Sequence, residues 1–208
     1  MAKQKEGVYD NILSCAKREF LNKGFIDASL RNIATDANTT TGSIYTRFGD
    51  KEGLFRALVE PVANEMKAYF FTIEETFSQK TPDEQSREMI NYSKKGALDM
   101  VDFIYNHFEE VQLLLDASYG TCFYDFLEEL VNIEVEYTYK FMKTTGCTSI
   151  NEKIIPEELI HIVTRSFFDG MFEIVRHKMS KENAIKYVTI LQKYHQKGYE
   201  VILSPQEE

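Results

Sequence analysis

The amino-acid sequence predicts an all-α protein of about nine helices, in which a three-helix N-terminal domain with a helix-turn-helix precedes a larger helical domain. Apolar residues recur every three or four positions along nearly all of the 208 residues, and no segment alternates between apolar and polar residues as a strand would. Only four Pro and ten Gly interrupt this spacing, so the helices are expected to be long. The hydrophobic share of 43% and the charged share of 27% are ordinary for a globular protein with its own core.

The first three helices are marked by the residues at their ends. Apolar side chains at four-residue spacing predict a helix over residues 7–23, which ends at Gly24. Ser29 is a typical N-cap residue and predicts a second, shorter helix over residues 30–37. A third short helix is expected over residues 40–47, after a tight polar turn.

The later helices are longer. Asp50 is expected to cap a helix over residues 51–77, and Pro61 inside that helix is expected to kink it. Pro156 occupies a typical first helical position, and Ser180 a typical N-cap position. The other predicted helices follow the same apolar spacing and cover residues 82–105, 107–118, 123–143, 156–178 and 181–203.

The stretch NTTTGSIYTRF consists largely of residues that form helices poorly, although it lies between two predicted helices. Ile44 and Phe48 are four residues apart, so both are expected to face the apolar residues of the second helix. Tyr45 points away from that face. Thr and Gly are small, and hydroxyl groups bind phosphate oxygens and base edges. The composition therefore favours a helix that enters the major groove of DNA.

The segment ASLRNIATDANTTTGSIYTRFGDKEGLF resembles the N-terminal region of the TetR (tetracycline repressor) family of bacterial transcriptional regulators. Both have a Ser or Thr that caps the second helix, an Ile-Ala pair, a small residue followed by Gly in the third helix, and Lys-Glu at the start of the fourth. The resemblance is specific over roughly residues 8–60 and continues beyond them only in the layout of helices. Asn38-Thr39 replaces the usual Gly-Val, and Asn is expected to accept the left-handed conformation of this turn. Thr46-Arg47 replaces the usual aromatic or His residues.

The resemblance implies a role in DNA binding at nine positions. The third helix should face the duplex, Gly42 should allow its close approach, and Lys51 should bind phosphate. By its chemistry Arg47 is a ligand for phosphate or guanine, although a solvated surface arginine fits the sequence nearly as well. With Arg47 added, the candidate DNA-binding residues are Ser29, Arg31, Thr40, Thr41, Gly42, Ser43, Tyr45, Thr46, Arg47 and Lys51.

The charge of the chain is divided unevenly. The formal net charge is -9 at pH 7. Residues 1–56 carry nine Lys or Arg against seven Asp or Glu, a net of +2, and the remaining residues carry a net of -11. A basic module on an acidic body is typical of a protein that binds nucleic acid through one end, although random scatter gives the same small excess.

Aromatic residues make up 13% of the chain and concentrate after the helix-turn-helix. Most of them fit a helical core, but a buried Tyr needs a hydrogen-bond partner, and an apolar cavity with a few polar groups suits a small molecule. The resemblance places an effector pocket among the middle helices. An acidic lining would favour cationic, lipophilic effectors, and a solvated acidic surface explains the same charges equally well. The candidate ligand-binding residues are Tyr92, Phe103, Tyr137, Phe141 and Phe168.

The last two predicted helices resemble a dimer interface, because each carries an apolar stripe and a glycine that costs helix stability. Two such helices from each subunit would form a four-helix bundle with two-fold symmetry. Packing of the same stripes on the middle helices of one chain is the alternative. The candidate interface residues are Leu159, Val163, Phe167, Gly170, Ile174, Val188, Leu191 and His195.

Nothing in the sequence favours an enzyme. Glu158 and His161 have the spacing of helical di-iron ligands, but such a site requires a second pair and two further Glu. The four His residues are dispersed, and neither a G-x-S-x-G motif nor a glycine-rich phosphate loop occurs. Cys15, Cys122 and Cys147 lack C-x-x-C spacing, so buried thiols are expected rather than disulfides or zinc ligands. No cofactor and no metal are expected.

The sequence thus supports the hypothesis of a homodimeric, ligand-responsive transcriptional regulator, a repressor that a small-molecule effector releases from a palindromic operator in double-stranded DNA. Residues 1–52 are assigned to DNA binding, and residues 53–208 to effector binding and dimerisation. The alternative is a helical small-molecule-binding protein or enzyme with a non-functional helix-turn-helix. No apolar run is long enough to span a bilayer, and the N-terminus lacks the apolar core of a signal peptide. A cytoplasmic protein without a membrane partner is therefore expected.

Overall fold

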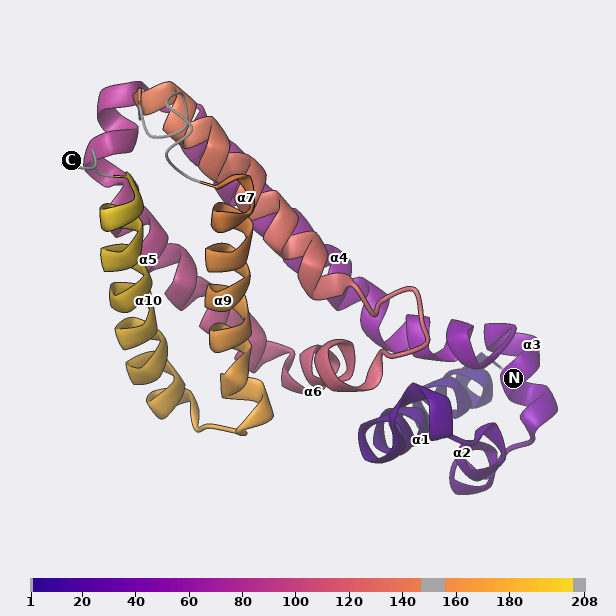
Figure 1. Cartoon of the computed structure of the whole chain (residues 1–208). Coiled ribbons are helices and arrows are strands. Elements are labelled where there is room, and N and C mark those ends of the chain that lie inside the picture. Colours follow the sequence, from indigo (N-terminus) through magenta and orange to yellow (C-terminus); the bar gives the residue numbers. More distant parts are fainter. Residues whose placement is uncertain (1, 147–155, 204–208) are drawn as a thin grey trace. The chain divides into compact units, whose positions relative to one another are not determined.

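The computed structural model describes residues 2–146 and 156–203 and confirms the all-α class expected from the sequence (Figure 1). These residues lie in α-helices, one π-helical turn and short connections, and no strand occurs among them. In chain order the elements are α1 (Ala2–Asp27), α2 (Leu30–Asp36), α3 (Thr41–Phe48), α4 (Lys51–Ser78), α5 (Pro82–Asn106), α6 (Phe108–Gln112), the π-helical turn η1 (Leu113–Ala117), α7 (Phe126–Thr145), α9 (Glu157–Arg176) and α10 (Lys181–Leu203).

The chain forms two compact units. The first unit consists of Met1–Glu65 and His107–Phe126, and the second unit consists of Met66–Asn106 and Leu127–Glu208. Helix α4 contributes its first half to the first unit and its second half to the second unit. The division expected at residue 52 is a division of function and stays a prediction.

The core of the first unit is built from one face each of α1, α2, α3 and the start of α4. Phe20, Ile33 and Ile44 are fully buried, as expected from the sequence. Phe55 of α4 meets the Phe20 ring edge-on, with ring centroids 5.1 Å apart. Each such side chain removes apolar surface from water and stabilises the unit by about 1.5–3 kcal/mol.

Polar residues between these helices determine where the helices begin. Ser29 accepts a hydrogen bond from the Asn32 N–H at 3.4 Å and caps α2. Asp50 accepts a hydrogen bond from the Gly53 N–H at 2.7 Å and caps α4. Asn38 has a φ of 50°, the left-handed conformation that the sequence predicts for the turn before α3. These three expectations are confirmed.

Gly53 is required by the turn between α3 and α4. A Cβ atom at this position would lie 1.9 Å from the carbonyl oxygen of Phe48, a backbone atom that moves only if the turn moves. Gly53→Ala is therefore expected to lower the free energy of unfolding by about 1–3 kcal/mol, although Ala is the better helix former. Thermal unfolding followed by circular dichroism measures this loss, and an unchanged Tm would show that the turn yields without cost.

The second unit is a bundle of α5, α7, α9, α10 and the second half of α4. Helices α9 and α10 run beside each other and are joined by a short turn (Figure 1). Tyr187 donates a hydrogen bond to the Gly170 carbonyl oxygen at 2.9 Å, and a Cβ atom at Gly170 would meet Leu191 at 3.2 Å. Tyr105 at the end of α5 donates to the Met179 carbonyl oxygen at 2.6 Å. Gly170 therefore permits a close approach of α9 and α10 within one chain.

One helix departs in detail from the sequence-based expectation. The single helix expected over residues 107–118 is divided into α6 and η1. Leu113 and Leu114 of η1 are both buried. Helix α4 continues through Pro61 as one helix, as expected from the sequence, and a kink at Pro61 stays a prediction.

The cysteines differ in their surroundings. Cys15 is buried, as expected, but the expectation of a buried thiol is wrong at Cys122. Cys122 lies in the turns between η1 and α7, where its sulfur accepts an N–H from Arg56 at 3.6 Å. Cys147 lies outside the described residues.

Candidate functional site

Helix α3 presents two chemically different faces. Ile44 is fully buried, and Phe48 is half-buried and stacks on Tyr9 with ring centroids 5.3 Å apart. Tyr45 is 53% exposed and lies outside the core, as the sequence indicates. The outer face is small, polar and open to a partner. The other predicted DNA-binding residues on or beside this helix are exposed or half-buried: Thr40, Thr41, Gly42, Ser43, Thr46 and Arg47.

Local hydrogen bonds hold several of these polar side chains. The Thr40 hydroxyl oxygen accepts from the Ser43 N–H at 3.1 Å and caps α3. Thr46 donates to the Gly42 carbonyl oxygen at 2.8 Å, which leaves its own oxygen as an acceptor. Arg47 donates to the Ser43 carbonyl oxygen at 3.2 Å and to the Ser43 hydroxyl. Because a guanidinium has five N–H donors, Arg47 keeps donors for a phosphate or a guanine.

No contact within the described part of the chain requires a glycine at position 42. A Cβ atom there would meet only the Thr40 hydroxyl oxygen, at 3.7 Å, which is an ordinary contact. Gly inside a helix costs about 1 kcal/mol relative to Ala. At Gly53, by contrast, a Cβ atom would overlap the backbone. The role of Gly42 in the close approach of DNA stays a prediction.

Lys51 has a structural role that sequence reasoning did not predict. Its Nζ donates to the carbonyl oxygens of Ile26 at 2.9 Å and Ala28 at 3.2 Å, and it lies 4.7 Å from the centroid of the Phe25 ring. The ammonium group thereby holds the end of α1 to the start of α4. An ammonium has three donors, so a phosphate contact is still open to Lys51 and stays a prediction.

Lys51→Met keeps most of the aliphatic stem and removes the ammonium group. Two carbonyl oxygens lose their donor, so we expect the free energy of unfolding without DNA to fall by about 1–2 kcal/mol. Urea unfolding measures the change, and Lys23→Met, at an exposed position of α1, is the matched control. Equal stability of the two variants would contradict the structural role.

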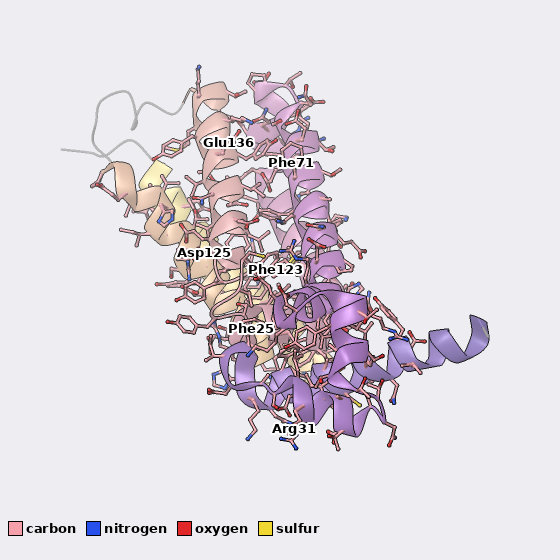
Figure 2. The ribbon with its side chains drawn as sticks, turned by 90° about the vertical axis from the view of Figure 1, so that its right-hand side faces the viewer. Phe25, Arg31, Phe71, Phe123, Asp125 and Glu136 are labelled. Carbon is pink, nitrogen blue, oxygen red and sulfur yellow. The ribbon has the colours of Figure 1, made fainter. Side chains whose placement is uncertain are left out.

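Ser29 and Arg31 lie at the start of α2. The Ser29 N–H donates to the Glu19 carboxylate at 3.1 Å, and its hydroxyl is occupied by the helix cap. Arg31 is exposed and its side chain extends outward from the ribbon (Figure 2). Arg31 is therefore the better placed of the two to reach a phosphate.

The second unit contains a cavity of about 170 Å³, lined from α4, α5, α7, α9 and α10. Of the five candidate ligand-binding residues, Phe103 does not line the cavity. It stacks on Tyr69, with ring centroids 6.5 Å apart. The other candidate ligand-binding residues line the cavity: Tyr92, Tyr137, Phe141 and Phe168.

Several polar side chains of the cavity wall have hydrogen-bond partners within the unit. Tyr92 donates a hydrogen bond to the Ile73 carbonyl oxygen at 3.0 Å. The hydroxyl groups of Thr164 and Tyr199 hydrogen-bond to each other at 2.7 Å. Such partners are what buried tyrosines require, so the wall combines aromatic surface with fixed polar groups.

Two glutamates of the lining, Glu74 of α4 and Glu134 of α7, are candidates that the sequence analysis missed. Both are half-buried, because part of each side chain faces the cavity. Burial raises the pKa of Glu134 to about 7, and burial together with the charge of Glu134 raises the pKa of Glu74 to about 9. A signal was available in the sequence, because Phe70 and Phe77 flank Glu74 on the same apolar face of its helix.

The residues predicted for a dimer interface are divided between interior and surface. Ile174 and Val188 are fully buried and His195 is 8% exposed, so these three pack inside the unit and offer little to a partner. The other candidates are half-buried: Leu159, Val163, Phe167, Gly170 and Leu191. The large apolar side chains that α9 and α10 expose are different ones: Ile162, Ile185, Ile190, Tyr194 and Val201.

The described residues contain no group of His, Cys, Asp and Glu arranged to hold a metal ion. His161 lies 2.7 Å from the Glu128 carboxylate, to which Arg165 also donates at 2.7 Å. His161 is thus part of a hydrogen-bonded cluster between α7 and α9. No helix within residues 2–146 and 156–203 is both long and apolar enough to cross a bilayer.

Comparison with known proteins confirms the resemblance noted in the sequence. Residues 12–58 match the profile of the family described as "Bacterial regulatory proteins, tetR family". No curated protein matches the sequence.

Several solved structures share the fold. NalD of Pseudomonas aeruginosa, the secondary repressor of the MexAB-OprM multidrug efflux pump, is 18% identical with a TM-score of 0.55, over 94% of this chain and 97% of NalD. PfmR, a TetR-family transcriptional regulator of Thermus thermophilus, is 14% identical with a TM-score of 0.55, over 96% and 97%. A fatty acid metabolism regulator of Clostridium perfringens is 20% identical with a TM-score of 0.53, over 88% and 96%.

Proposed function

We propose, from the TetR-family DNA-binding region that this chain carries in residues 12–58, that the protein is a homodimeric transcriptional repressor which a small-molecule effector releases from its operator. The proposal assigns DNA binding to α3, effector binding to the cavity of the second unit, and dimerisation to α9 and α10. Its place of action is the cytoplasm, where the operator is.

The observation that carries the proposal is the outer face of α3. This helix gives one residue, Ile44, to the core, and it exposes a tyrosine, hydroxyl groups and an arginine around a glycine that the fold does not require. Such a face fits a major groove, in which side chains reach base edges and phosphates. Two copies in a symmetric dimer would address half-sites about 34–36 Å apart.

The exposed apolar side chains of α9 and α10 support the dimer. Ile162, Ile190 and Tyr194 are 60%, 69% and 72% exposed. Burial of these side chains against a second copy would remove apolar surface from water, in the four-helix arrangement common to two-fold dimers. These residues, rather than the buried Ile174 and Val188, are the ones we assign to the interface.

Helix α4 supports effector-controlled release. The same helix begins beside α3 and supplies cavity residues such as Phe70 and Glu74. Suppose that the protein has two conformations that differ in the placement of α4. An effector that binds one of these conformations more tightly would increase its population, and so change the affinity for DNA. NalD, which has the same fold, is a repressor.

A gel shift on the DNA upstream of the protein's own gene tests the proposal. We expect a specific complex whose affinity falls as salt rises, because phosphate contacts release counterions. Tyr45→Ala should weaken it by about tenfold or more, since a base or phosphate contact is worth about 1–3 kcal/mol. Tyr124→Ala, at another exposed tyrosine of the first unit, is the control.

The alternative, a small-molecule-binding protein or enzyme with a non-functional helix-turn-helix, predicts the opposite. Weak binding that ignores both DNA sequence and Tyr45→Ala would support that alternative and overturn the proposed function.

A further inference from the structure

The two carboxyl groups in the cavity have no partner in the described part of the chain. Glu74 and Glu134 face the cavity from different helices, and no hydrogen bond or ion pair joins either of them to a described residue. A carboxylate enclosed by protein without a partner is costly. Helix α4 and helix α7 therefore each hold an acidic group where an apolar residue would stabilise the bundle more.

The rest of the lining supplies no positive charge that could pair with the two carboxyl groups. No Lys or Arg occurs among the described lining residues. His195 lies in the lining, and burial lowers the pKa of its imidazole, so it is neutral at pH 7. Phenylalanine and tyrosine side chains form part of the remaining wall, and aromatic faces attract cations. The tyrosine hydroxyl groups near Glu74 and Glu134, those of Tyr92 and Tyr199, do not ionise near pH 7.

We propose that the cavity binds small organic cations, with an ammonium group beside Glu74 and Glu134 and an apolar, preferably aromatic, body against the phenylalanine walls. This inference rests on the proposed function, because it names the chemical class of the effector. The volume limits the size: a cavity of about 150 Å³ holds a benzene molecule. A cavity of about 170 Å³ therefore suits a ligand of roughly ten non-hydrogen atoms, plus what side-chain movement adds.

Charge distinguishes this class from the alternatives. An ammonium group would give Glu74 and Glu134 the opposite charge that they lack, and it would favour their ionised forms. A ligand with a carboxylate of its own would meet two acidic groups and no basic one. A neutral ligand would fill the same apolar space without using either glutamate.

Three probes with one skeleton and three charges test the proposal by isothermal titration calorimetry near neutral pH. They are 3-phenylpropylamine, 3-phenylpropan-1-ol and 3-phenylpropanoate. We expect the amine to bind at least about tenfold more tightly than the alcohol, a difference of about 1.4 kcal/mol, and the carboxylate to bind more weakly than the alcohol. Binding of the amine should also release protons, which makes the measured heat depend on the buffer.

The variant Glu74→Gln/Glu134→Gln keeps the shape of both side chains and removes their charge. We expect it to bind the amine and the alcohol equally, and unchanged alcohol binding shows that its cavity is intact. Glu136→Gln is the control, because Glu136 is an exposed residue of the same helix α7 (Figure 2). It should bind the amine like the original protein.

Three results would overturn the inference: equal binding of the three probes, preference for the carboxylate, or no binding of the amine. A double variant that still prefers the amine would overturn it as well. The proposed function is tested separately by the gel shift. A protein that binds the amine but forms no specific complex with DNA would support this inference and contradict the proposed function.

Discussion

Gly42→Leu is expected to leave the protein folded and to lower its operator affinity by roughly two orders of magnitude, about 2.7 kcal/mol. Position 42 is exposed, and a Cβ atom there would meet one side-chain oxygen at an ordinary distance. Leu is also a better helix former than Gly by nearly 1 kcal/mol, so the free energy of unfolding should stay equal or rise. On the DNA side, a four-carbon side chain would hold α3 away from the groove and weaken every contact of Tyr45, Thr46 and Arg47 together.

The measurement pairs urea unfolding with gel-shift titration on the same preparation. Gly7→Leu is the control, since Gly7 is also exposed and a Cβ atom at that position would meet no other atom within 4 Å. That substitution should change neither quantity. A Gly42→Leu protein that binds the operator as before would show that this face of α3 does not touch DNA.

Much of the fold follows from periodicity and end residues. Apolar spacing places the helices, and Ser29 and Asp50 cap α2 and α4 as their side-chain chemistry predicts. The helix-turn-helix could be predicted because its signal is local: Ile44 and Tyr45 are neighbours in sequence, yet one is fully buried and the other 53% exposed. A rotation of about 100° per residue makes that contrast predictable.

The features that could not be predicted from the sequence depend on contacts between segments that are distant along the chain. Lys51 bonds to carbonyl oxygens at the end of α1, 25 and 23 residues away, and no spacing rule connects such positions. An apolar stripe shows that α9 and α10 bury a face, but it does not say whether the neighbour is the same chain. For that reason the stripe alone predicts Ile174 and Val188 as interface residues, although both pack inside the unit. The acidic pair of the cavity could not be predicted for the same reason, because Glu74 and Glu134 are 60 positions apart in the sequence.

The acidic pair in the cavity should make the protein less stable as pH rises. Both carboxyl groups have a higher pKa in the folded protein, about 7 for Glu134 and about 9 for Glu74, than the ordinary value of 4.5. Below pH 4.5 both groups are protonated whether or not the chain is folded, and their contribution to stability is fully present. Above pH 4.5 the two groups lose their protons in the unfolded chain but keep them in the folded chain. The free energy of unfolding therefore falls until the pH passes the pKa values of the folded protein. The loss between pH 5 and pH 9 should be on the order of a few kcal/mol, reduced by water in the cavity.

Urea unfolding of the original protein and of Glu74→Gln/Glu134→Gln, compared across this range, isolates the effect. The difference between the two proteins cancels the titration of groups that both retain, such as the neighbouring His195. We expect the double variant to become more stable relative to the original protein as pH rises from 5 to 9, because an amide cannot ionise. A bound ammonium ligand should reduce the difference, since it stabilises the ionised carboxylates of the original protein alone. Parallel curves at all pH values would show that the two carboxyl groups titrate as they do in water and are not enclosed by the bundle.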